Sequence, residues 1–277
     1  YEETSFPGHF RAKTVRHRAK DYGTIRIFSF ATREPEALAN EFVRLINLMP
    51  GNGVILDVRA NGGGNILAAE WMLQALCNRA IHPEPAQFIN TPLVEELCRL
   101  HSPSSTLPEL DLTPWHKSIR EMRQTGAVYS LGHPITPPGS LRPFRARKRL
   151  KLVLITDALC YSATDIFASG FQDHKLGKIV GIHGNTGAGG ANVWTHALLH
   201  HLTIQADGSS KYFRPLPYGA NFRVAVRRTL RVGSNAGIPL EDLGVKPDVI
   251  HRMTKKDLLG ENEDLTSTAC ELLAQMA

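Results

Sequence analysis

The chain has 277 residues, of which 42% are hydrophobic and 21% charged, and it contains 23 glycines and 17 prolines. These proportions are ordinary for a globular protein, so they exclude an intrinsically disordered chain and a collagen-like repeat. The sequence has no run of eighteen apolar residues, and residues 1–18 lack the apolar centre of a signal peptide. The chain opens on Tyr1 rather than Met, so we expect it to be a processed or excised part of a longer protein.

The formal net charge is +6, and basic residues are densest in one run beside a proline-rich segment. That run contains Arg142, Arg145, Arg147, Lys148, Arg149 and Lys151. We interpret it as a solvated linker, with a nucleic-acid site as the alternative. No RNP-like aromatic pattern, zinc-finger spacing or helix-turn-helix signature accompanies the run, so the sequence predicts no nucleic-acid partner.

Cysteine and histidine spacing gives no sign of a metal site. The four cysteines form no C-x-x-C pair, and only two of the twelve histidines, His200 and His201, are adjacent. Neighbouring residues on a strand point to opposite faces, so two adjacent histidines could not share a metal there. We expect buried free thiols and no structural metal.

Strand-like and helix-like segments alternate along much of the chain. The pattern predicts strands at 23–30, 53–58, 151–156 and 177–181, and helices at 32–48, 66–76, 164–172 and 263–276. This alternation is typical of an α/β sheet. Residues 82–150 interrupt it with many prolines and only short helical patches such as 91–100, which predicts an insertion or lid. Residues 195–206 and 222–231 predict two further strands.

Four loops rich in small or acidic residues follow the predicted strands, where open α/β sheets bind ligands. They read DVRANGGGN (57–65), DALCYSATD (157–165), GNTGAGG (184–190) and GIPLEDLGVKPD (237–248). The consecutive glycines fit either an oxyanion hole or a tight turn. Ser162 fits either a helix N-cap or a nucleophile beside the positive end of a helix. Glu241 and Asp242 could orient a base or cap a turn.

Taken in order, these blocks resemble the S41 serine peptidases, which include tail-specific C-terminal processing peptidases and the tricorn core protease. The similar segments are GTIRIFSF (23–30), GVILDVRANGGG (53–64), LVLITDALCYSATDIFASGFQDHKLGKIVG (152–181), GNTGAGGANV (184–193) and EDLGVKPD (241–248). They extend over most of the chain outside 82–150. The resemblance implies an α/β domain of the crotonase-like (ClpP/crotonase) type with a helical or loop insertion.

The resemblance also implies a site. The family's nucleophile, the first residue of an S-A-x-[DE/S] turn, falls on Ser162, and its oxyanion hole falls on the amide of Ala163 and on Gly62 or Gly63. The E-x-x-G-[VI]-x-P-D element of the tricorn-like branch places the acidic member of a triad on Glu241. A serine peptidase with an acyl-enzyme intermediate follows, acting on protein or peptide substrates without a metal or organic cofactor.

The general base is where this sequence departs from the family pattern. The lysine of tail-specific peptidases would fall at Ala188 or Gly189, and the histidine of tricorn-like enzymes at Arg26, which cannot accept a proton at neutral pH. Other branches carry the histidine in a D-x-H-T-like turn of an N-terminal domain, ahead of a PDZ-like module. We therefore expect residues 1–277 to be the catalytic core of a longer protein with N-terminal and PDZ-like domains.

Four histidines of this chain are fallback candidates for the base, each with a surface role as the competing interpretation: His9, His17, His174 and His183. The lack of an evident base supports an alternative function, a non-catalytic S41-like domain that binds peptides or lipophilic ligands. Family habit suggests a bacterial envelope or secreted setting.

Overall fold

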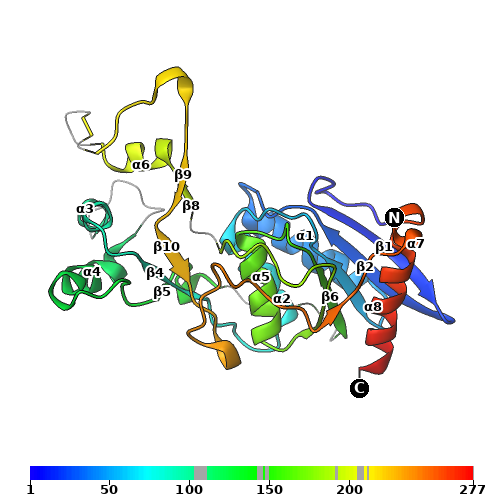
Figure 1. The fold of residues 1–277 in the computed structure, drawn as a ribbon. Coiled ribbons are helices and arrows are strands. Elements are labelled where there is room, and N and C mark those ends of the chain that lie inside the picture. The colour runs from blue at the N-terminus through cyan, green and yellow to red at the C-terminus, as the bar shows by residue number, and fades with distance from the viewer. Residues whose placement is uncertain are drawn as a thin grey trace. The chain divides into compact units, whose positions relative to one another are not determined.

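The computed structural model describes residues 1–102, 111–141, 146, 150–190, 193–204, 209–210 and 212–276. The chain forms two compact units (Figure 1). The first unit comprises Tyr1–Pro83, Thr136–Ala191 and Arg231–Ala277, and the second comprises Glu84–Ile135 and Asn192–Leu230. Among the described residues, no helix combines the length and apolar character needed to cross a membrane.

A six-stranded sheet organises the first unit, in the order β1-β2-β3-β6-β7-β11. Its strands are β1 (Phe10–His17), β2 (Lys20–Ile27), β3 (Val54–Asp57), β6 (Leu152–Thr156), β7 (Gly177–Gly181) and β11 (Val249–Ile250). The β1–β2 hairpin is antiparallel, and every other pairing is parallel. The loops that follow β2, β3, β6 and β7 therefore lie at one edge of the sheet, which we call the carboxyl edge.

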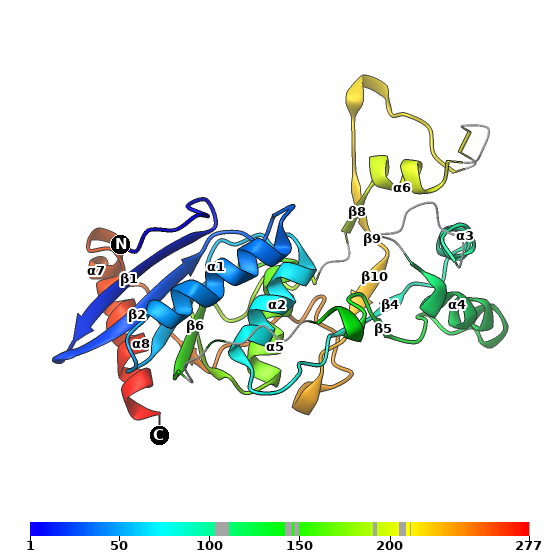
Figure 2. The same ribbon diagram turned by 180° about the vertical axis from the view of Figure 1, so that it is seen from behind.

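Helices cover both faces of this sheet. They are α1 (Pro35–Leu48), α2 (Ile66–Leu76), α5 (Ala163–Asp173), α7 (Lys255–Leu259) and α8 (Glu263–Gln275), with short 3-10 turns η1 (Pro138–Ser140) and η3 (Gly233–Asn235). The helices α1, α2 and α5 pack together over one face, as Figure 2 shows from behind. Helix α8 packs on the other face, where Leu265 and Leu273 join Ile55 and Val153 in a second buried cluster.

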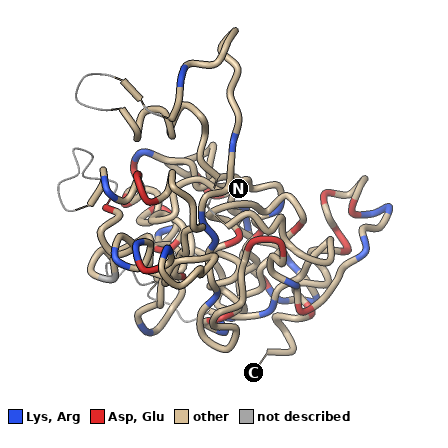
Figure 3. The backbone as a smooth tube through the Cα atoms, turned by 60° about the vertical axis from the view of Figure 1, so that its left-hand side comes forward, with Lys and Arg blue, Asp and Glu red and all other residues tan. Residues whose placement is uncertain are grey.

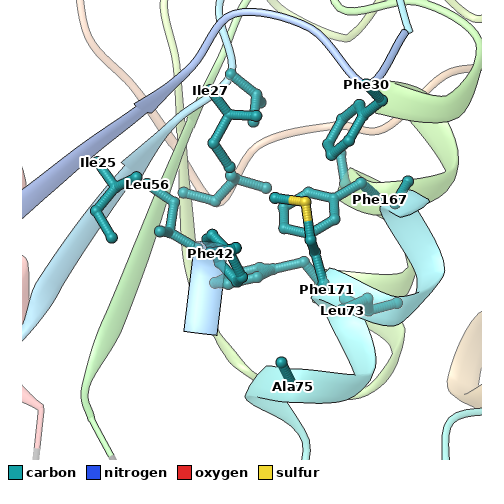
Figure 4. Packing of buried hydrophobic residues seen from close by; sticks show 14 of the residues in the cluster. Ile25, Ile27, Phe30, Phe42, Leu56, Leu73, Ala75, Phe167 and Phe171 are labelled. Atoms are coloured by element: carbon teal, nitrogen blue, oxygen red, sulfur yellow. The ribbon is translucent and has the colours of Figure 1, made fainter. Parts of the chain in front are cut away.

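The main core lies between the sheet and α1, α2 and α5. Figure 4 shows Ile25 and Ile27 of β2 facing aromatic side chains that include Phe30 and Phe167. The rings of Phe30 and Phe167 have centroids 5.5 Å apart. Burying each large apolar side chain contributes about 1.5–3 kcal/mol, so this core fixes where α5 begins relative to the sheet.

The second unit has a core of its own. Its elements are β4 (Pro85–Phe88), α3 (Pro92–Leu100), α4 (Thr113–Thr125), β5 (His133–Pro134), β8 (Val193–Thr195), α6 (His196–Leu202), η2 (Pro217–Gly219), β9 (Arg223–Ala225) and β10 (Arg227–Thr229). They form a three-stranded sheet, β10-β4-β5, and a two-stranded sheet, β8-β9. Phe88 packs edge-on against both Trp115 and Trp194, at centroid distances of 5.4 and 6.1 Å.

The α/β class expected from the sequence is confirmed, but one strand prediction is wrong. Within the expected strand at 195–206, β8 ends at Thr195 and α6 begins at the next residue. The Thr195 side chain caps this helix by accepting the N–H of Leu198 at 3.0 Å. Leu199 and Leu202, three residues apart, face the core, so a helical period competes here with the strand pattern.

Charged residues of both signs are interspersed along the described part of the chain (Figure 3). The basic run singled out in the sequence falls at 142–145 and 147–149, outside the described residues, and only Lys151 of it is described. The Lys151 ammonium donates to the backbone oxygen of Met276.

Candidate active site

Ser162 lies in the turn that leads from β6 into α5, at the carboxyl edge of the sheet. It is the N-cap residue of α5, but its side chain makes no capping hydrogen bond. Its backbone has φ 58° and ψ −125°, outside the regions that residues with a Cβ ordinarily occupy. A serine with such a backbone between a strand and a helix is also found in the nucleophile elbow of the α/β-hydrolases.

The glycine loop after β3 packs directly against this turn. Gly63 has φ +97°, and an added Cβ there would lie 2.6 Å from Ser162 Cβ and 2.8 Å from the backbone N of Ala163. The conformation and the space both require glycine at this position. The structure thus brings Gly63, Ser162 and Ala163 together, and their role in an oxyanion hole stays a prediction.

The backbone N–H groups of this cluster differ in whether they already have a hydrogen-bond acceptor. The N–H of Gly63 donates to Asn61 Oδ1 at 2.9 Å. Among the described residues, no acceptor is found for the N–H of Gly62 or of Ala163. Asn61 also accepts the Tyr161 N–H at its carbonyl (3.1 Å), and its Nδ2 donates to Ile27 O (3.1 Å). Asn61 therefore ties the loop to the Ser162 turn and already accepts the N–H of Gly63.

Glu241 lies in a turn that packs on the loop at 184–190. The N–H of Asp242 donates to Ala188 O at 3.2 Å. A Cβ added to Gly190 would lie 3.0 Å from Glu241 Oε1, so the carboxylate rests on this loop. The same loop lies against the Tyr161 ring, only 1.9 Å from an added Cβ on Gly189. Ser162 and Glu241 are thus joined through one shared segment.

The fallback histidines separate into two groups. His17 pairs with Lys20 at the start of β2, at the opposite edge of the sheet from Ser162. His174 is the C-cap of α5, about 18 Å along the helix from Ser162 at 1.5 Å per residue. His174 Nε2 accepts the His82 N–H at 3.0 Å, and burial lowers the pKa of its imidazole. Neither His17 nor His174 can reach the Ser162 hydroxyl in this fold.

His9 and His183 lie at the carboxyl edge. His9 Nε2 is 3.1 Å from the carbonyl oxygen of Ala31, a residue that touches Gly64 of the glycine loop. His183 Nδ1 accepts the N–H of Ala158, in the segment between β6 and Ser162, at 3.3 Å. His9 and His183 therefore lie at the same edge of the sheet as Ser162, the candidate nucleophile.

Arg26, at the position where tricorn-like enzymes carry histidine, is fully engaged in another role. Its guanidinium donates to Asp57 Oδ1 at 2.6 Å and to the carbonyl of Arg59. Throughout the described part of the chain, no group of three or more His, Cys, Asp or Glu side chains is arranged to hold a metal.

Sequence reasoning missed one residue that the structure places at the centre of this site, Asp165. It is fully buried on the first turn of α5 and accepts hydrogen bonds from the loop at 184–190. Its signal in the sequence was ambiguous, because an acidic residue is favoured in the first turn of any helix.

Comparisons with known proteins show which family and which solved structures the chain resembles. The Peptidase family S41 model matches residues 21–251. No curated protein sequence matches the chain. Among solved structures, mature CPAF aligns with a TM-score of 0.64 and 16% identity over 95% of this chain and 55% of that chain. A putative peptidase from Parabacteroides merdae gives 0.58 and 18%, over 97% and 67%. The photosystem II D1 C-terminal processing protease gives 0.50 and 18%, over 96% and 52%.

The structural likenesses, all at low identity, show a shared fold. The chain spans little more than half the length of mature CPAF and of the D1 processing protease. The family match is of another kind, because it covers most of the chain and includes β3, β6 and β7, the glycine loop, Ser162 and Glu241. The chain belongs to peptidase family S41.

Proposed function

We propose that the chain is the catalytic core of a serine peptidase that hydrolyses peptide bonds through an acyl-enzyme. The observation that carries this proposal is the backbone of Ser162, whose positive φ at a strand-to-helix turn leaves the hydroxyl free of any capping bond. Such strain persists where the surrounding structure imposes it, and it gathers at functional sites. Gly63 and the start of α5 supply that surrounding structure.

In this mechanism Ser162 Oγ attacks the scissile carbonyl carbon while a base takes the hydroxyl proton. Negative charge develops on the carbonyl oxygen, where the N–H groups of Ala163 and of Gly62 or Gly63 stabilise it. The base then protonates the leaving amine. In the second half of the reaction, water attacks the acyl-enzyme with help from the same base, which releases the acyl group. Glu241 orients the base and stabilises its charged form.

A histidine from sequence upstream of this chain is our proposed base. It would lie against Glu241, as the acidic member of a triad requires. His9 and His183, at the same edge as Ser162, are the alternatives within the chain. His9→Ala and His183→Ala variants separate these sources, because loss of reactivity in one of them would assign the base to that residue.

Labelling with a fluorophosphonate probe tests the nucleophile. We expect a form extended by its upstream sequence, which would carry the proposed base, to be labelled, and the label to disappear in its Ser162→Ala variant. Ser29→Ala is the matched control, because Ser29 also lies at the carboxyl edge, and its hydroxyl accepts the Ala31 N–H at 3.0 Å. Label retained in Ser162→Ala, or lost equally in both variants, would contradict the proposal.

A second experiment compares probe labelling of residues 1–277 with labelling of a form extended by its upstream sequence. Labelling of the extended form alone places the base upstream, and labelling of both places it within residues 1–277. If neither folded form reacts, the peptidase proposal fails, and a peptide- or ligand-binding domain takes its place.

A further inference from the structure

The buried carboxylate of Asp165 connects two segments of the proposed site. Asp165 follows Ser162 by three residues on the first turn of α5 and is 0% exposed. Burial of an ionised carboxylate is costly unless donors surround it, so the partners of this side chain must be accounted for.

Two backbone N–H groups from a distant loop donate to this carboxylate. The Ala188 N–H reaches Oδ1 at 3.2 Å, and the Gly189 N–H reaches Oδ2 at 3.0 Å. An ionised carboxylate accepts hydrogen bonds and donates none, so these two donors suit it. Burial raises the pKa of Asp165, and hydrogen bonding from the Thr186 hydroxyl and from the N–H groups of Gly189, Ala188 and Ser162 lowers it in turn.

This arrangement differs from an ordinary acidic residue at a helix start. Such a residue interacts with the N–H groups of its own helix and faces solvent. The two N–H groups that donate to Asp165, those of Ala188 and Gly189, come instead from a loop more than twenty residues away in sequence.

The loop held by Asp165 is the one on which Glu241 rests. Ala188 donates its N–H to Asp165 and accepts the N–H of Asp242 at its carbonyl oxygen. Gly190, two residues on, touches the Glu241 carboxylate. The carboxylate of Asp165 therefore links the first turn of α5, which Ser162 caps, to the support of the candidate triad acid.

We propose that Asp165 is a positioning residue of the peptidase site, which holds Ser162 in its strained backbone conformation and fixes the 186–189 loop beneath Glu241. This inference rests on the proposed function. Asp165 is fully buried, so it acts through Ser162 and Glu241 without touching substrate.

Asp165→Asn tests the proposal, with Asp173→Asn as its matched control. Asp173 is also a buried carboxylate of α5, and it holds a different segment through Arg231, the Val232 N–H and Asn235. Both variants make the same chemical change on the same helix, at its two ends. Hydrogen exchange and fluorophosphonate labelling rates are measured on the folded protein, well below the unfolding temperature of each variant.

We expect Asp165→Asn to speed amide exchange at Ser162 and at 186–189 and to slow labelling on the order of 100-fold, as misplacement of reacting groups by about 1 Å can do. Asp173→Asn is expected to lower thermal stability without either effect. If Asp165→Asn fails to fold, Thr186→Val removes one donor and should give the same changes in weaker form. Thr186→Ser keeps the hydroxyl and should restore both readouts.

Unchanged exchange or unchanged labelling in Asp165→Asn would overturn the positioning role while leaving the peptidase proposal intact. Equal slowing in Asp173→Asn would overturn it too, because general loosening of α5 would then suffice. If neither residues 1–277 nor the form extended by upstream sequence reacts with the probe while folded, the proposed function itself fails, and the positioning role of Asp165 fails with it.

Discussion

At Gly63 the addition of one methyl group is enough to disturb the proposed site. Gly63→Ala forces a Cβ into a positive φ and to within 2.6 Å of Ser162 Cβ. Strain and overpacking together should lower the free energy of unfolding by about 2–4 kcal/mol. Labelling should slow roughly tenfold or more, because Ser162 must shift. Denaturant unfolding and probe kinetics measure the two effects.

Gly62→Ala is the control for this prediction. An added Cβ at Gly62 meets nothing within 4 Å, and Gly62 has no positive φ. Stability should change by no more than about 0.5 kcal/mol, as for most surface substitutions, and labelling should persist. Equal damage from both substitutions would show that any side chain in this loop is harmful, contrary to the steric argument.

Glu70, buried on α2, should make stability depend on pH. Burial raises the pKa of its carboxyl from 4.5 to about 7. Between these values the folded chain keeps a proton that the unfolded chain has released, so the free energy of unfolding falls as pH rises. Glu70→Gln should match wild type near pH 4 and exceed it by up to about 3 kcal/mol above pH 8. Urea unfolding across this range measures the difference, and a pH-independent difference would contradict the prediction.

At the scale of elements, α2 depends on a cap that adjoins the glycine loop. The Asn65 side chain accepts the Ala68 N–H at 3.1 Å, and its backbone N–H donates to Phe30 O at 2.9 Å. Asn65→Ala should lower the free energy of unfolding by about 1 kcal/mol, since an unmade N-cap bond costs about that much. Asn65→Asp keeps the acceptor and should restore most of the loss. Thermal unfolding compares the two, and equal loss in both would assign the effect to the loop instead of the cap.

Element prediction from the sequence succeeded where the pattern was strong. The bounds of α2 and β7 are those expected at 66–76 and 177–181. The strand β1 went unpredicted because its buried residues, Phe10 and Ala12, alternate with basic ones and give little apolar signal. The helix α4 went unpredicted inside a proline-rich stretch, although Pro114 suits its first turn.

The candidate site was predictable in part. The order of motifs along the chain pointed to Ser162, the glycine loop and Glu241. In the structure the glycine loop packs directly on the Ser162 turn, and the 184–190 loop joins that turn to Glu241. The role of Asp165 was hidden, because its donors lie in a distant segment and only the fold brings them to it. Local patterns identify side chains that could do chemistry, whereas buried polar partners depend on tertiary contacts.

At the scale of the whole molecule, the parallel sheet explains why short motifs far apart in sequence meet. Four successive loops leave parallel strands at the carboxyl edge of the first unit. The second unit has a separate apolar core around Phe88, Trp115 and Trp194. Units with their own cores can unfold in separate steps, so a single two-state transition is not expected.

Tryptophan fluorescence can report on each unit. Trp71 lies in the first unit, and Trp115 and Trp194 lie in the second, all buried. A Trp71→Phe background thus reports the second unit, and a Trp115→Phe/Trp194→Phe background reports the first. Leu97→Ala, in the second core, should lower the stability reported by the second-unit probes by about 2–5 kcal/mol and leave Trp71 little affected. Leu56→Ala, in the first core, should do the reverse. If either substitution shifts both sets of probes equally, the two units unfold as one cooperative structure.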